Sequence, residues 1–367
     1  MFFWTLQIPI YREVQSKLSA ANFVASGIKH GVNDGLTVAI IGATGAVGQE
    51  FLRLFDERNF PVSSLRLLAS ERSVGKTAKF RGKEYLIEEA TEDAFDGVDV
   101  AFFSAGASRS RKLVPAALKA GALVIDNSSA YRTDPNIPLV VPEVNADAIG
   151  PEDRLIAVPN CSAIILLTAV SPLRQLGTVD RLIVSTYQSA SGGGAGMMRL
   201  LEAETRAVLS GEDLPESSLN HRYAFNLFSH NTPIDDDGYN EEESKVIFES
   251  RKILSMPSLK INVTCVRVPV LRAHTESVTV EFDGSAPSIE EVRKVLGSSA
   301  GVRVVDDRAA NRFPTPLDAS GQGDVLVGRI RQDLSNPNAI CMLVSGDQLL
   351  KGAALNAVQI AELVLAR

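Results

Sequence analysis

Short apolar runs alternate with helix-like segments through the first part of the chain. The apolar runs cover residues 36–41, 65–69, 98–103 and 123–126. An uninterrupted apolar run of this length is typical of a strand that is buried on both faces of a parallel sheet. The alternation therefore predicts an α/β domain with a doubly wound, mostly parallel sheet over residues 36–160.

The pattern changes after residue 160. Residues 260–270 alternate apolar and polar positions, as in a strand with one covered face, and residues 277–282 are predicted to be its neighbour. Further strands are predicted over residues 181–188, 325–331 and 339–344. We expect an α+β substrate domain of antiparallel type over residues 161–345, and a terminal helix within 346–367 that completes the first domain.

A glycine-rich turn follows the first predicted strand and precedes a helical pattern. Its spacing is G-x-x-G-x-x-G, a variant of the Rossmann fingerprint, in which glycines let the backbone approach a pyrophosphate at a helix N-terminus. The residues expected to hold a dinucleotide are Gly42, Thr44, Gly45, Ala46, Val47 and Gly48. The first domain is thus predicted to be Rossmann-like, and a tight structural turn is the alternative interpretation.

The residues after the second predicted strand bear on the choice of cofactor. An NAD-preferring site places Asp or Glu there to accept from the ribose 2′-OH. Here Arg72 is flanked by hydroxyls, including Ser73, and this combination suits a 2′-phosphate. We therefore predict NADP, although Glu71 argues for NAD and a solvated polar loop is the other interpretation.

Residues 158–162 lie between an apolar strand and an apolar helical run, which places Cys161 at a helix N-terminus. The helix dipole and its unpaired N–H groups favour a thiolate there. Cys161 is therefore a candidate nucleophile, and the backbone N–H at Cys161 and the Asn160 amide are candidate oxyanion donors. The alternative is a small residue packed under the start of a helix.

Other polar residues lie at the predicted strand ends or on one helical face. Arg132 follows a strand of the first domain and is expected to bind an anion there, whereas Gln188 ends a long strand and would orient an acyl group. Glu242 and Lys245 are three residues apart and would bind an ammonium group and an anion. His274 is expected at the turn between the strands over 260–270 and 277–282 and is a candidate acid/base, although a lone histidine is more often structural.

Composition and charge exclude several classes of protein. The net charge of −7 and the lack of a dense Lys/Arg tract argue against nucleic acid as a partner. No apolar run approaches the length of a membrane span, so no membrane partner is expected. The acidic clusters at 235–237 and 241–243 lack the spacing of a calcium loop, so no metal is expected. Three widely spaced cysteines favour a reducing compartment, which predicts a cytoplasmic protein.

Residues 1–35 differ in character from the rest of the chain. They are poor in acids and carry Arg12, Lys17 and Lys29 before the first convincing strand. We expect a leader that is either disordered or a transit segment, in which case the compartment would be a plastid.

Several motifs together resemble those of aspartate-semialdehyde dehydrogenases, in the order that the family has them and from about residue 36 to the C-terminus. They cover residues 42–48, 159–162, 185–188, 242–245, 265–270 and 350–354. The resemblance implies NADPH-dependent reductive dephosphorylation of L-aspartyl-4-phosphate to L-aspartate-4-semialdehyde through a cysteine thioester. This step is shared by lysine (through diaminopimelate), methionine, threonine and isoleucine biosynthesis.

The same resemblance implies a role for each matching residue. Cys161 would be the nucleophile, His274 the acid/base and Gln188 the residue that orients the acyl group. Arg267 and Glu242 would hold the substrate's carboxylate and amino group, and Arg132 and Lys245 the phosphate. Cofactor contacts are implied for Ser191, Gly192 and Gln348. The second domain would serve dimerisation, in a homodimer or homotetramer.

Two departures from the family pattern and two other functions complete the expectations. Residues 191–196 form a run of glycines and other small residues that the family pattern lacks. Ala163 stands where the family has threonine. One alternative function is that of an N-acetyl-glutamyl-phosphate reductase, in which Glu242 would have no free ammonium to bind. The other is a non-catalytic NADP-binding sensor, which would have no chemical reason to keep Cys161, Gln188 and His274.

Overall fold

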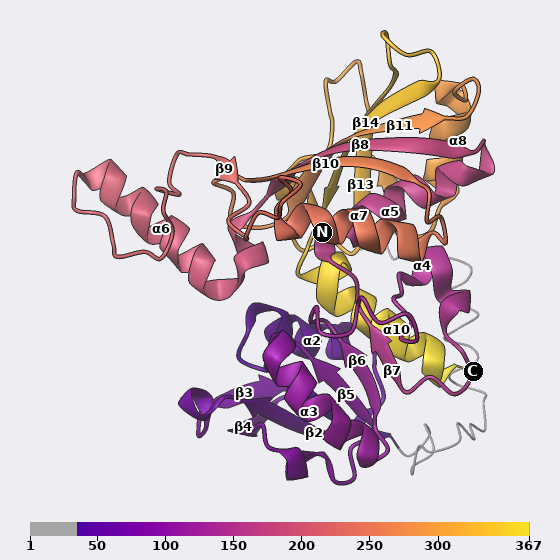
Figure 1. Ribbon diagram of the computed structural model, residues 1–367. Coiled ribbons are helices and arrows are strands. Elements are labelled where there is room, and N and C mark those ends of the chain that lie inside the picture. The colour runs from indigo at the N-terminus through magenta and orange to yellow at the C-terminus, as the bar shows by residue number, and fades with distance from the viewer. Residues whose placement is uncertain (1–34, 367) are drawn as a thin grey trace. The chain divides into compact units, whose positions relative to one another are not determined.

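The computed structural model describes residues 35–366, which divide into two compact units (Figure 1). The first unit comprises the chain up to Pro142, Ala146–Val158 and the segment from Ala354, and the second comprises Glu143–Asn145 and Pro159–Ala353. The leader expected over residues 1–35 lies outside the described residues except for Gly35. Among the described helices, none combines the length and the apolar character that a membrane span requires.

The first unit contains a seven-stranded sheet in the order β3-β4-β2-β1-β5-β6-β7. Its strands are β1 (Leu36–Ile41), β2 (Val62–Ala69), β3 (Thr77–Phe80), β4 (Lys83–Glu89), β5 (Val100–Phe103), β6 (Leu123–Asp126) and β7 (Leu155–Ala157). All neighbouring pairs are parallel except β3 and β4. The doubly wound sheet predicted from the apolar runs is therefore confirmed, and the edge hairpin β3-β4 is an addition to it.

Helices cover both faces of this sheet, which explains why its central strands are apolar throughout. Phe51 and Phe55 of α2 (Ala46–Glu57) pack on Phe102, whereas α3 (Ala107–Lys119) packs on the opposite face, against Phe103. The C-terminal helix α10 (Leu355–Leu365) packs against α2 and β6.

Polar contacts also hold α10 in the first unit. The guanidinium group of Arg58 binds both carboxylate oxygens of Glu362, at 2.9 and 2.6 Å. Asn356 donates to the carbonyl oxygen of Val140 at 2.9 Å. The helix is therefore an integral part of this unit, although it lies at the other end of the sequence.

The second unit contains another seven-stranded sheet, in the order β12-β13-β14-β11-β8-β10-β9. Its strands are β8 (Val179–Gln188), β9 (Phe228–Ser229), β10 (Lys260–Arg267), β11 (His274–Phe282), β12 (Val302–Val304), β13 (Val325–Gln332) and β14 (Ala339–Gly346). The sheet is mixed, because β8 and β10 are parallel, as are β12 and β13. This agrees with the α+β class predicted for the second domain.

One predicted strand pairing is wrong. The strand over residues 260–270 was expected to have residues 277–282 as its neighbour, but β8 lies between β10 and β11 and pairs with both. The loop after Arg267 carries the chain past the end of β8. His274 is consequently the first residue of β11 rather than a residue of a hairpin turn.

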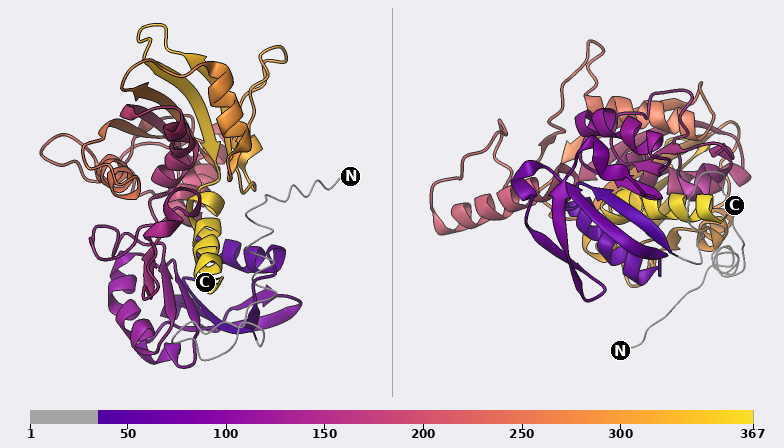
Figure 2. Two further views of the ribbon diagram at one scale, coloured as in Figure 1. Left: turned by 90° about the vertical axis from the view of Figure 1, so that its right-hand side faces the viewer. Right: turned by 90° about the horizontal axis from the view of Figure 1, so that it is seen from below.

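Helices α5 (Cys161–Val170) and α7 (Glu241–Ile253) lie together on one face of this sheet (Figure 1). Every residue of α5 after Cys161 is buried, as expected for a helix that is apolar all round. Helix α6 (Gly194–Ser210) stands away from the sheet in Figure 1 and in the right-hand view of Figure 2. The remaining helices are α4 (Pro142–Asn145), α8 (Ile289–Ser298) and α9 (Pro316–Ala319).

Short irregular helices join these elements. Single 3-10 turns cover Glu71–Ser73, Glu92–Phe95, Ala146–Ala148, Ser171–Gln175 and Ala190–Gly193. The helix expected from residue 348 onwards begins instead as a π-helical turn, Leu350–Ala354, which leads into α10. Such turns are rare and occur often at functional sites.

Candidate active site

The helix that carries Cys161 begins at that residue and is capped by its neighbour Asn160. The side-chain oxygen of Asn160 accepts hydrogen bonds from the backbone N–H groups of Ser162 at 2.9 Å and Ala163 at 3.3 Å. Asparagine is among the preferred N-cap residues because it satisfies such donors. The half-buried Cys161 thus lies in the first turn of a capped helix, where the helix dipole stabilises a negative charge.

A buried carboxylate ties this helix start to two other elements. The Nδ2 group of Asn160 and the Nε2 group of Gln188 both donate to Oε1 of Glu242, at 2.8 and 3.1 Å. Gln188 is itself held by Thr186, whose hydroxyl donates to its amide oxygen at 3.1 Å. Three residues that the sequence singles out, on α5, β8 and α7, therefore meet at one oxygen atom.

The electrostatic surroundings keep Glu242 ionised. Burial acts to raise its pKa, but the nearby His230, the hydrogen bond from Asn160, the charge of Lys245 and the hydrogen bond from Gln188 bring the pKa below its ordinary value. The Nζ atom of Lys245 lies 4.0 Å from Glu242 and 2.7 Å from Glu241.

The acidic run at the start of α7 serves the helix itself. Asn240 and Glu243 form a reciprocal capping box, and the three glutamates of the first turn lie at the positive end of the helix dipole. Within residues 35–366, no group of three His, Cys, Asp or Glu side chains is arranged to hold a metal ion.

His274 lies in a second group of hydrogen bonds, around Ser189. The backbone N–H of Ser189 donates to Nδ1 of His274 at 3.1 Å, and the Ser189 hydroxyl lies at the same distance. Because a backbone N–H is always a donor, Nδ1 must accept and the ring proton must reside on Nε2. Burial, followed by the charge of Arg267, lowers the pKa of His274 to about 3, so the ring is neutral at pH 7.

Gly192 brings the backbone close to both His274 and Arg267. An ideal Cβ atom at Gly192 would lie 3.0 Å from Nε2 of His274 and 3.1 Å from Nη1 of Arg267, which is tighter than ordinary contacts. The glycine-rich loop therefore makes the close approach that its composition predicts. Gln348 joins the same group, because its Nε2 donates to Ser191 and its oxygen accepts from the N–H of Ala273 at 3.0 Å.

His230 belongs to the site but was missed in the sequence. The Nη2 group of Arg267 donates to Nε2 of His230 at 2.6 Å, while Nη1 donates to the carbonyl oxygen of Ser189 at 3.0 Å. Arginine can only donate, so His230 must be neutral. Burial, and then the charge of Arg267, lowers its pKa to about 4. In the sequence, the only local indication of this role would have been its position directly after strand β9. That strand is only two residues long, so no strand pattern could be recognised there.

The π-helical turn supports Cys161 from behind. An ideal Cβ atom at Gly352 would lie 2.9 Å from Cβ of Cys161, so a side chain at this position would displace the cysteine. The adjacent Lys351 is fully buried, and its Nζ atom forms an ion pair with Glu143. This buried ion pair fixes the turn that places the Gly352 backbone against the nucleophile candidate.

Arg132 is the one predicted catalytic or substrate-binding residue that belongs to the first unit. It lies beyond the carboxyl end of β6, where open α/β sheets bind ligands. Its Nη2 group donates to the carbonyl oxygen of Asn127 at 2.8 Å, and the residue is largely buried.

Two cavities of the first unit lie where the sequence predicts a dinucleotide. One, of about 230 Å³, is lined by Gly42, Thr44 and Gly45 together with the ends of β1, β2 and β5. The other, of about 310 Å³, is lined by Ser70, Glu71, Arg72, Glu89, Arg109 and Lys112 among others. Ser73 lies beside them, with its hydroxyl 3.4 Å from that of Thr44.

The glycine turn has room only for glycine at its two ends. Gly42 has φ +95°, and a Cβ atom on it would lie 2.4 Å from the carbonyl oxygen of Ser104. A Cβ atom at Gly48 would lie 2.3 Å from the Gly42 oxygen. Ala46 and Val47 are the first residues of α2, so their N–H groups belong to its unbonded first turn.

Arg109 and Lys112 are cofactor-site candidates that were missed in the sequence. They lie one turn apart on α3, and Arg109 lines both cavities. Together with Arg72 they place three cations around the second cavity, against the two carboxylates of Glu71 and Glu89. The sequence did contain an indication of their role. Helix α3 follows directly after the carboxyl end of β5, and ligands of open α/β sheets bind at such strand ends.

Comparisons with known proteins agree with this geometry. Residues 37–151 match the family model "Semialdehyde dehydrogenase, NAD binding domain", and residues 170–351 match "Semialdehyde dehydrogenase, dimerisation domain". The two units thus correspond to the domain pair of a semialdehyde dehydrogenase, a nucleotide-dependent oxidoreductase.

Similar proteins narrow the class further. Aspartate-semialdehyde dehydrogenases from Prochlorococcus marinus and Bacillus subtilis are 50% and 44% identical to the chain, over 90% and 89% of it and 96% and 97% of their own lengths. The structure of aspartate semialdehyde dehydrogenase II from Vibrio cholerae superposes with a TM-score of 0.86 at 43% identity, covering 90% of this chain and 98% of that one. The chain belongs to the aspartate-semialdehyde dehydrogenase family, which confirms the resemblance of its motifs.

We expect Gly352→Ala to lower the turnover number about tenfold or more, because the added methyl group displaces Cys161 from its place at the helix start. Steady-state oxidation of aspartate semialdehyde measures this, with circular dichroism to verify folding. Gly297→Ala is the matched control, since a Cβ atom there meets nothing within 4 Å. Equal turnover in the two variants would show that the contact has no catalytic consequence.

We expect buried His274 to make the protein less stable as the pH falls. Its pKa is about 3 in the folded protein and 6.5 when exposed, so between these values only the unfolded chain binds the proton. The free energy of unfolding therefore decreases below pH 6.5, by about 2 kcal/mol at pH 5. Urea unfolding at pH 7.5 and at pH 5 measures the free energy of unfolding that each protein loses between these values. We expect the loss to be about 2 kcal/mol smaller in His274→Gln than in the unsubstituted protein. An identical loss in both proteins would contradict it.

Proposed function

We propose that the protein catalyses the NADPH-dependent reductive dephosphorylation of L-aspartyl-4-phosphate to L-aspartate-4-semialdehyde and phosphate, through a thioester on Cys161. This reaction would serve lysine, methionine, threonine and isoleucine biosynthesis, with diaminopimelate on the lysine branch. The observation that carries the proposal is the buried Glu242 carboxylate, which is hydrogen bonded to the N-cap residue of the cysteine-bearing helix and to Gln188.

Cys161 would begin the reaction as a thiolate. Its sulfur attacks the acyl carbon of the substrate, a thioester forms, and the bond to phosphate breaks. Lys245 and Arg132 would offset the negative charge of the departing phosphate. The backbone N–H at Cys161 would stabilise the oxyanion, and so would the Nδ2 group of Asn160, which also serves Glu242.

His274 would manage the proton of the second half-reaction. Its Nε2 atom is buried and protonated, and in the described structure it has no hydrogen-bond partner, so its proton is available to a substrate oxygen. Through this N–H it would stabilise the oxyanion that forms as the thioester is reduced, until the aldehyde carbonyl reforms and the thiolate leaves.

The first-unit cavities fit a dinucleotide, because the Gly42 turn, the start of α2 and the cations around the second cavity match a pyrophosphate and a 2′-phosphate. NADP would be held there by Gly42, Thr44, Gly45, Ala46, Val47, Gly48, Arg72 and Ser73. Ser191, Gly192 and Gln348 of the second unit would contact its nicotinamide half. When bound, the reduced cofactor supplies the hydride.

Glu242 and Arg267 would select the aspartyl group. The ionised carboxylate of Glu242 is buried, with Lys245 4.0 Å away, and the substrate's free ammonium group would provide it with a directly bound cation. Arg267 forms no ion pair with a described carboxylate, and both residues that it binds, Ser189 and His230, are uncharged. Its charge is thus available to the substrate's α-carboxylate.

Two structures of relatives support the choice of substrate and cofactor. The Vibrio cholerae enzyme has been solved "complexed with ASA", and at 43% identity it aligns with 90% of this chain. An aspartate semialdehyde dehydrogenase from Candida albicans, 25% identical with a TM-score of 0.70, has been solved with NADP.

The two alternative functions have less support. An N-acetyl-glutamyl-phosphate reductase would present an uncharged acetylated amine to Glu242, whose buried carboxylate suits a charged ammonium group instead. A non-catalytic sensor would need the nucleotide cavities but not the array around Cys161 and His274.

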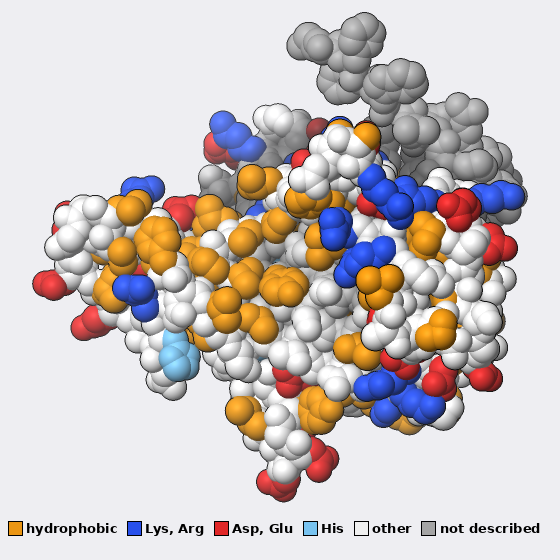
Figure 3. All heavy atoms as spheres, turned by 90° about the horizontal axis from the view of Figure 1, so that it is seen from above, with side chains coloured by type: hydrophobic (Ala, Val, Ile, Leu, Met, Phe, Trp, Pro, Cys, Tyr) orange, Lys and Arg blue, Asp and Glu red, His pale blue; other side chains and the backbone are white. Residues whose placement is uncertain are grey.

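We further propose that the protein forms a homodimer or homotetramer. The second unit matches a family model described as a dimerisation domain. Figure 3 shows apolar side chains gathered from α6 towards the β9 end of the sheet. Exposed apolar residues of these elements and their flanking loops include Tyr187, Leu209, Phe225, Leu227 and Leu271. An apolar surface of this kind is typical of a permanent protein interface.

The proposed compartment is the cytoplasm. All three cysteines are thiols rather than disulfides, which suits a reducing environment. The plastid alternative depends on residues 1–34, which lie outside the described part of the chain.

We expect Cys161→Ala to reduce phosphate-dependent oxidation of aspartate semialdehyde by at least about a thousandfold, because no other group can form the thioester. Binding of NADP, measured by titration calorimetry, should persist. Cys341→Ala is the control, since this half-buried thiol lies on β14 rather than at the helix start. Turnover close to that of the unsubstituted protein would refute the thioester mechanism.

We expect Arg72→Ala and Arg109→Ala each to raise the KM for NADP about tenfold, the effect of losing one charge-assisted hydrogen bond, with little change for NAD. Arg111→Ala is the matched control, because Arg111 is an exposed residue of α3 that does not line the cavities. A KM that rises equally for both cofactors would contradict recognition of a 2′-phosphate.

A further inference from the structure

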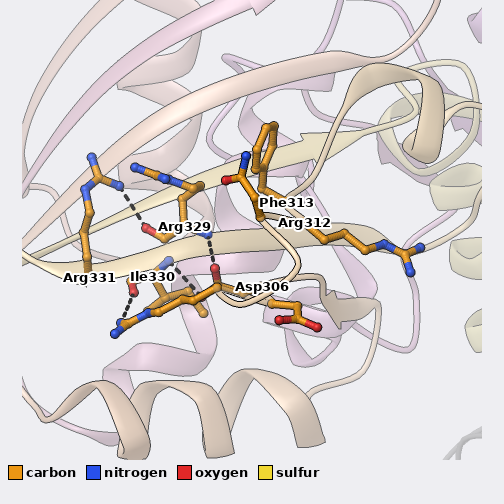
Figure 4. A pocket seen from close by; sticks show the side chains of 9 residues that line it. Asp306, Arg312, Phe313, Arg329, Ile330 and Arg331 are labelled. Atoms are coloured by element: carbon orange, nitrogen blue, oxygen red, sulfur yellow. Dashed lines mark hydrogen bonds between the residues drawn. The ribbon is translucent and has the colours of Figure 1, made fainter.

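A pocket rich in arginine lies in the second unit, away from the site described above. It has a volume of about 300 Å³ and is formed by residues 306–308 and 311–313 and by Arg329, Ile330 and Arg331 of β13 (Figure 4). Strand register separates it from His274. His274 pairs with Gly346, whereas Arg331 is in register with Cys341, which lies five residues earlier in β14. That offset corresponds to roughly 17 Å along the strands.

The carboxylates in the pocket wall are already used by other groups. Asp306 accepts from the backbone N–H groups of Arg329 at 2.8 Å and Ile330 at 3.1 Å, and it also forms an ion pair with Arg293, which lies outside the pocket wall. Asp307 accepts from the N–H groups of two residues of its own turn, Ala309 and Ala310. Asp306 is therefore paired with an arginine outside the pocket wall, whereas Asp307 keeps its negative charge and offsets part of the positive charge of the pocket.

Four guanidinium groups face one unpaired carboxylate, that of Asp307, around this small pocket, which leaves a net positive charge. Arg308, Arg312, Arg329 and Arg331 are exposed, and none of them forms an ion pair with a carboxylate of residues 35–366. Their protein hydrogen bonds are to backbone carbonyl groups, from Arg331 to Arg329 at 2.8 Å and from Arg308 to Ile330 at 3.4 Å. Such a concentration of positive charge is unusual in a chain whose net charge is −7.

The backbone that presents two of these arginines is constrained. Arg329 has φ +54°, a conformation that bulky residues rarely adopt, and the register with β14 shifts between Gly328 and Arg331. A Cβ atom at Gly328 would lie 2.0 Å from the carbonyl oxygen of Val305. The packed loop and Asp306 thus hold a conformation that would otherwise be unfavourable, as is common at ligand sites.

The side chains of Arg329 and Arg331 extend to the same side of the strand, whereas Arg312 extends in another direction (Figure 4). Two neighbouring guanidinium groups match the geometry of phosphate or paired carboxylate oxygens. The pocket is larger than a single inorganic ion requires, so it suits a small organic or condensed anion.

We propose that this pocket is a binding site for a small multiply charged anion, of the phosphorylated or polycarboxylate class, held by Arg329 and Arg331. Arg308 and Arg312 add to the positive potential that attracts it. The ligand is not a participant in the reaction proposed above, because the pocket lies several strand residues away from His274 and shares none of its residues.

The test is protection of individual arginines in the full chain, in its native assembly, against modification by phenylglyoxal, with peptide mass spectrometry. Pyrophosphate and citrate at 5 mM are the two probes, which separate the phosphorylated from the polycarboxylate class. We expect one or both to slow modification of Arg329 and Arg331 about fivefold, as for a Kd near 1 mM. Arg181 and Arg303, which belong to the same sheet but not to the pocket, should be unaffected.

Several results would overturn the proposal. These are equal rates with and without both probes, equal protection by potassium chloride of matched ionic strength, and protection of Arg181 and Arg303 to the same degree. The readout is local, so anions bound at the catalytic or nucleotide sites do not affect it.

A variant provides a second measurement. In the double variant Arg329→Gln, Arg331→Gln, titration calorimetry with the effective probe should show one binding site fewer per chain than in Arg181→Gln. An unchanged number of sites refutes the proposal. If the double variant does not fold, the protection experiment on the unsubstituted chain still decides.

Discussion

The arrangement of the second unit depends on one buried carboxylate. An ionised group away from water is stable only when hydrogen bonds replace its hydration, and an unpaired one destabilises a fold by several kcal/mol. Glu242 meets this requirement with the amide groups of Asn160 and Gln188. Asn160 has to present its nitrogen to the carboxylate and its oxygen to the N–H groups of α5, so a single side chain fixes both the helix start and the carboxylate.

The same logic extends to the histidines. Each ring receives a hydrogen bond from a group that can only donate. The backbone N–H of Ser189 donates to His274, and the guanidinium group of Arg267 donates to His230. Both rings are therefore neutral with known tautomers, and Arg267 remains the cation of this group. The second unit thus holds a negative charge at Glu242 and a positive charge at Arg267 as two separate buried groups.

Sequence patterns predicted the features that depend on local chemistry. Fully apolar runs located the central strands of the first unit, and the glycines at 42 and 48 located a turn in which a side chain would collide with the backbone. The start of α5 at Cys161 followed from the change from turn to apolar helix. Each of these signals lies within a few residues, so no tertiary information was needed.

The features that were missed depend on contacts between distant segments. Alternation in β10 and β11 showed that each has a covered face but not that β8 lies between them. His230 acquires its role only through Arg267, and Arg109 only through the cavity that α3 shares with β1 and β2. The hairpin β3-β4 is an exposed edge with many charged residues, so it lacked the apolar pattern of the buried strands.

The place of α10 has a consequence for the synthesis of the protein. The ribosome releases the chain from its N-terminus, so the seven strands of the first unit emerge long before the helix that covers α2 and β6. The second unit is complete in sequence at Ala353, whereas the first lacks α10 until Leu355–Leu365 emerge. During translation the apolar surface of α2 and β6 that α10 later covers is therefore exposed. The first unit, although it is synthesised first, can complete its folding only after the second unit has been synthesised.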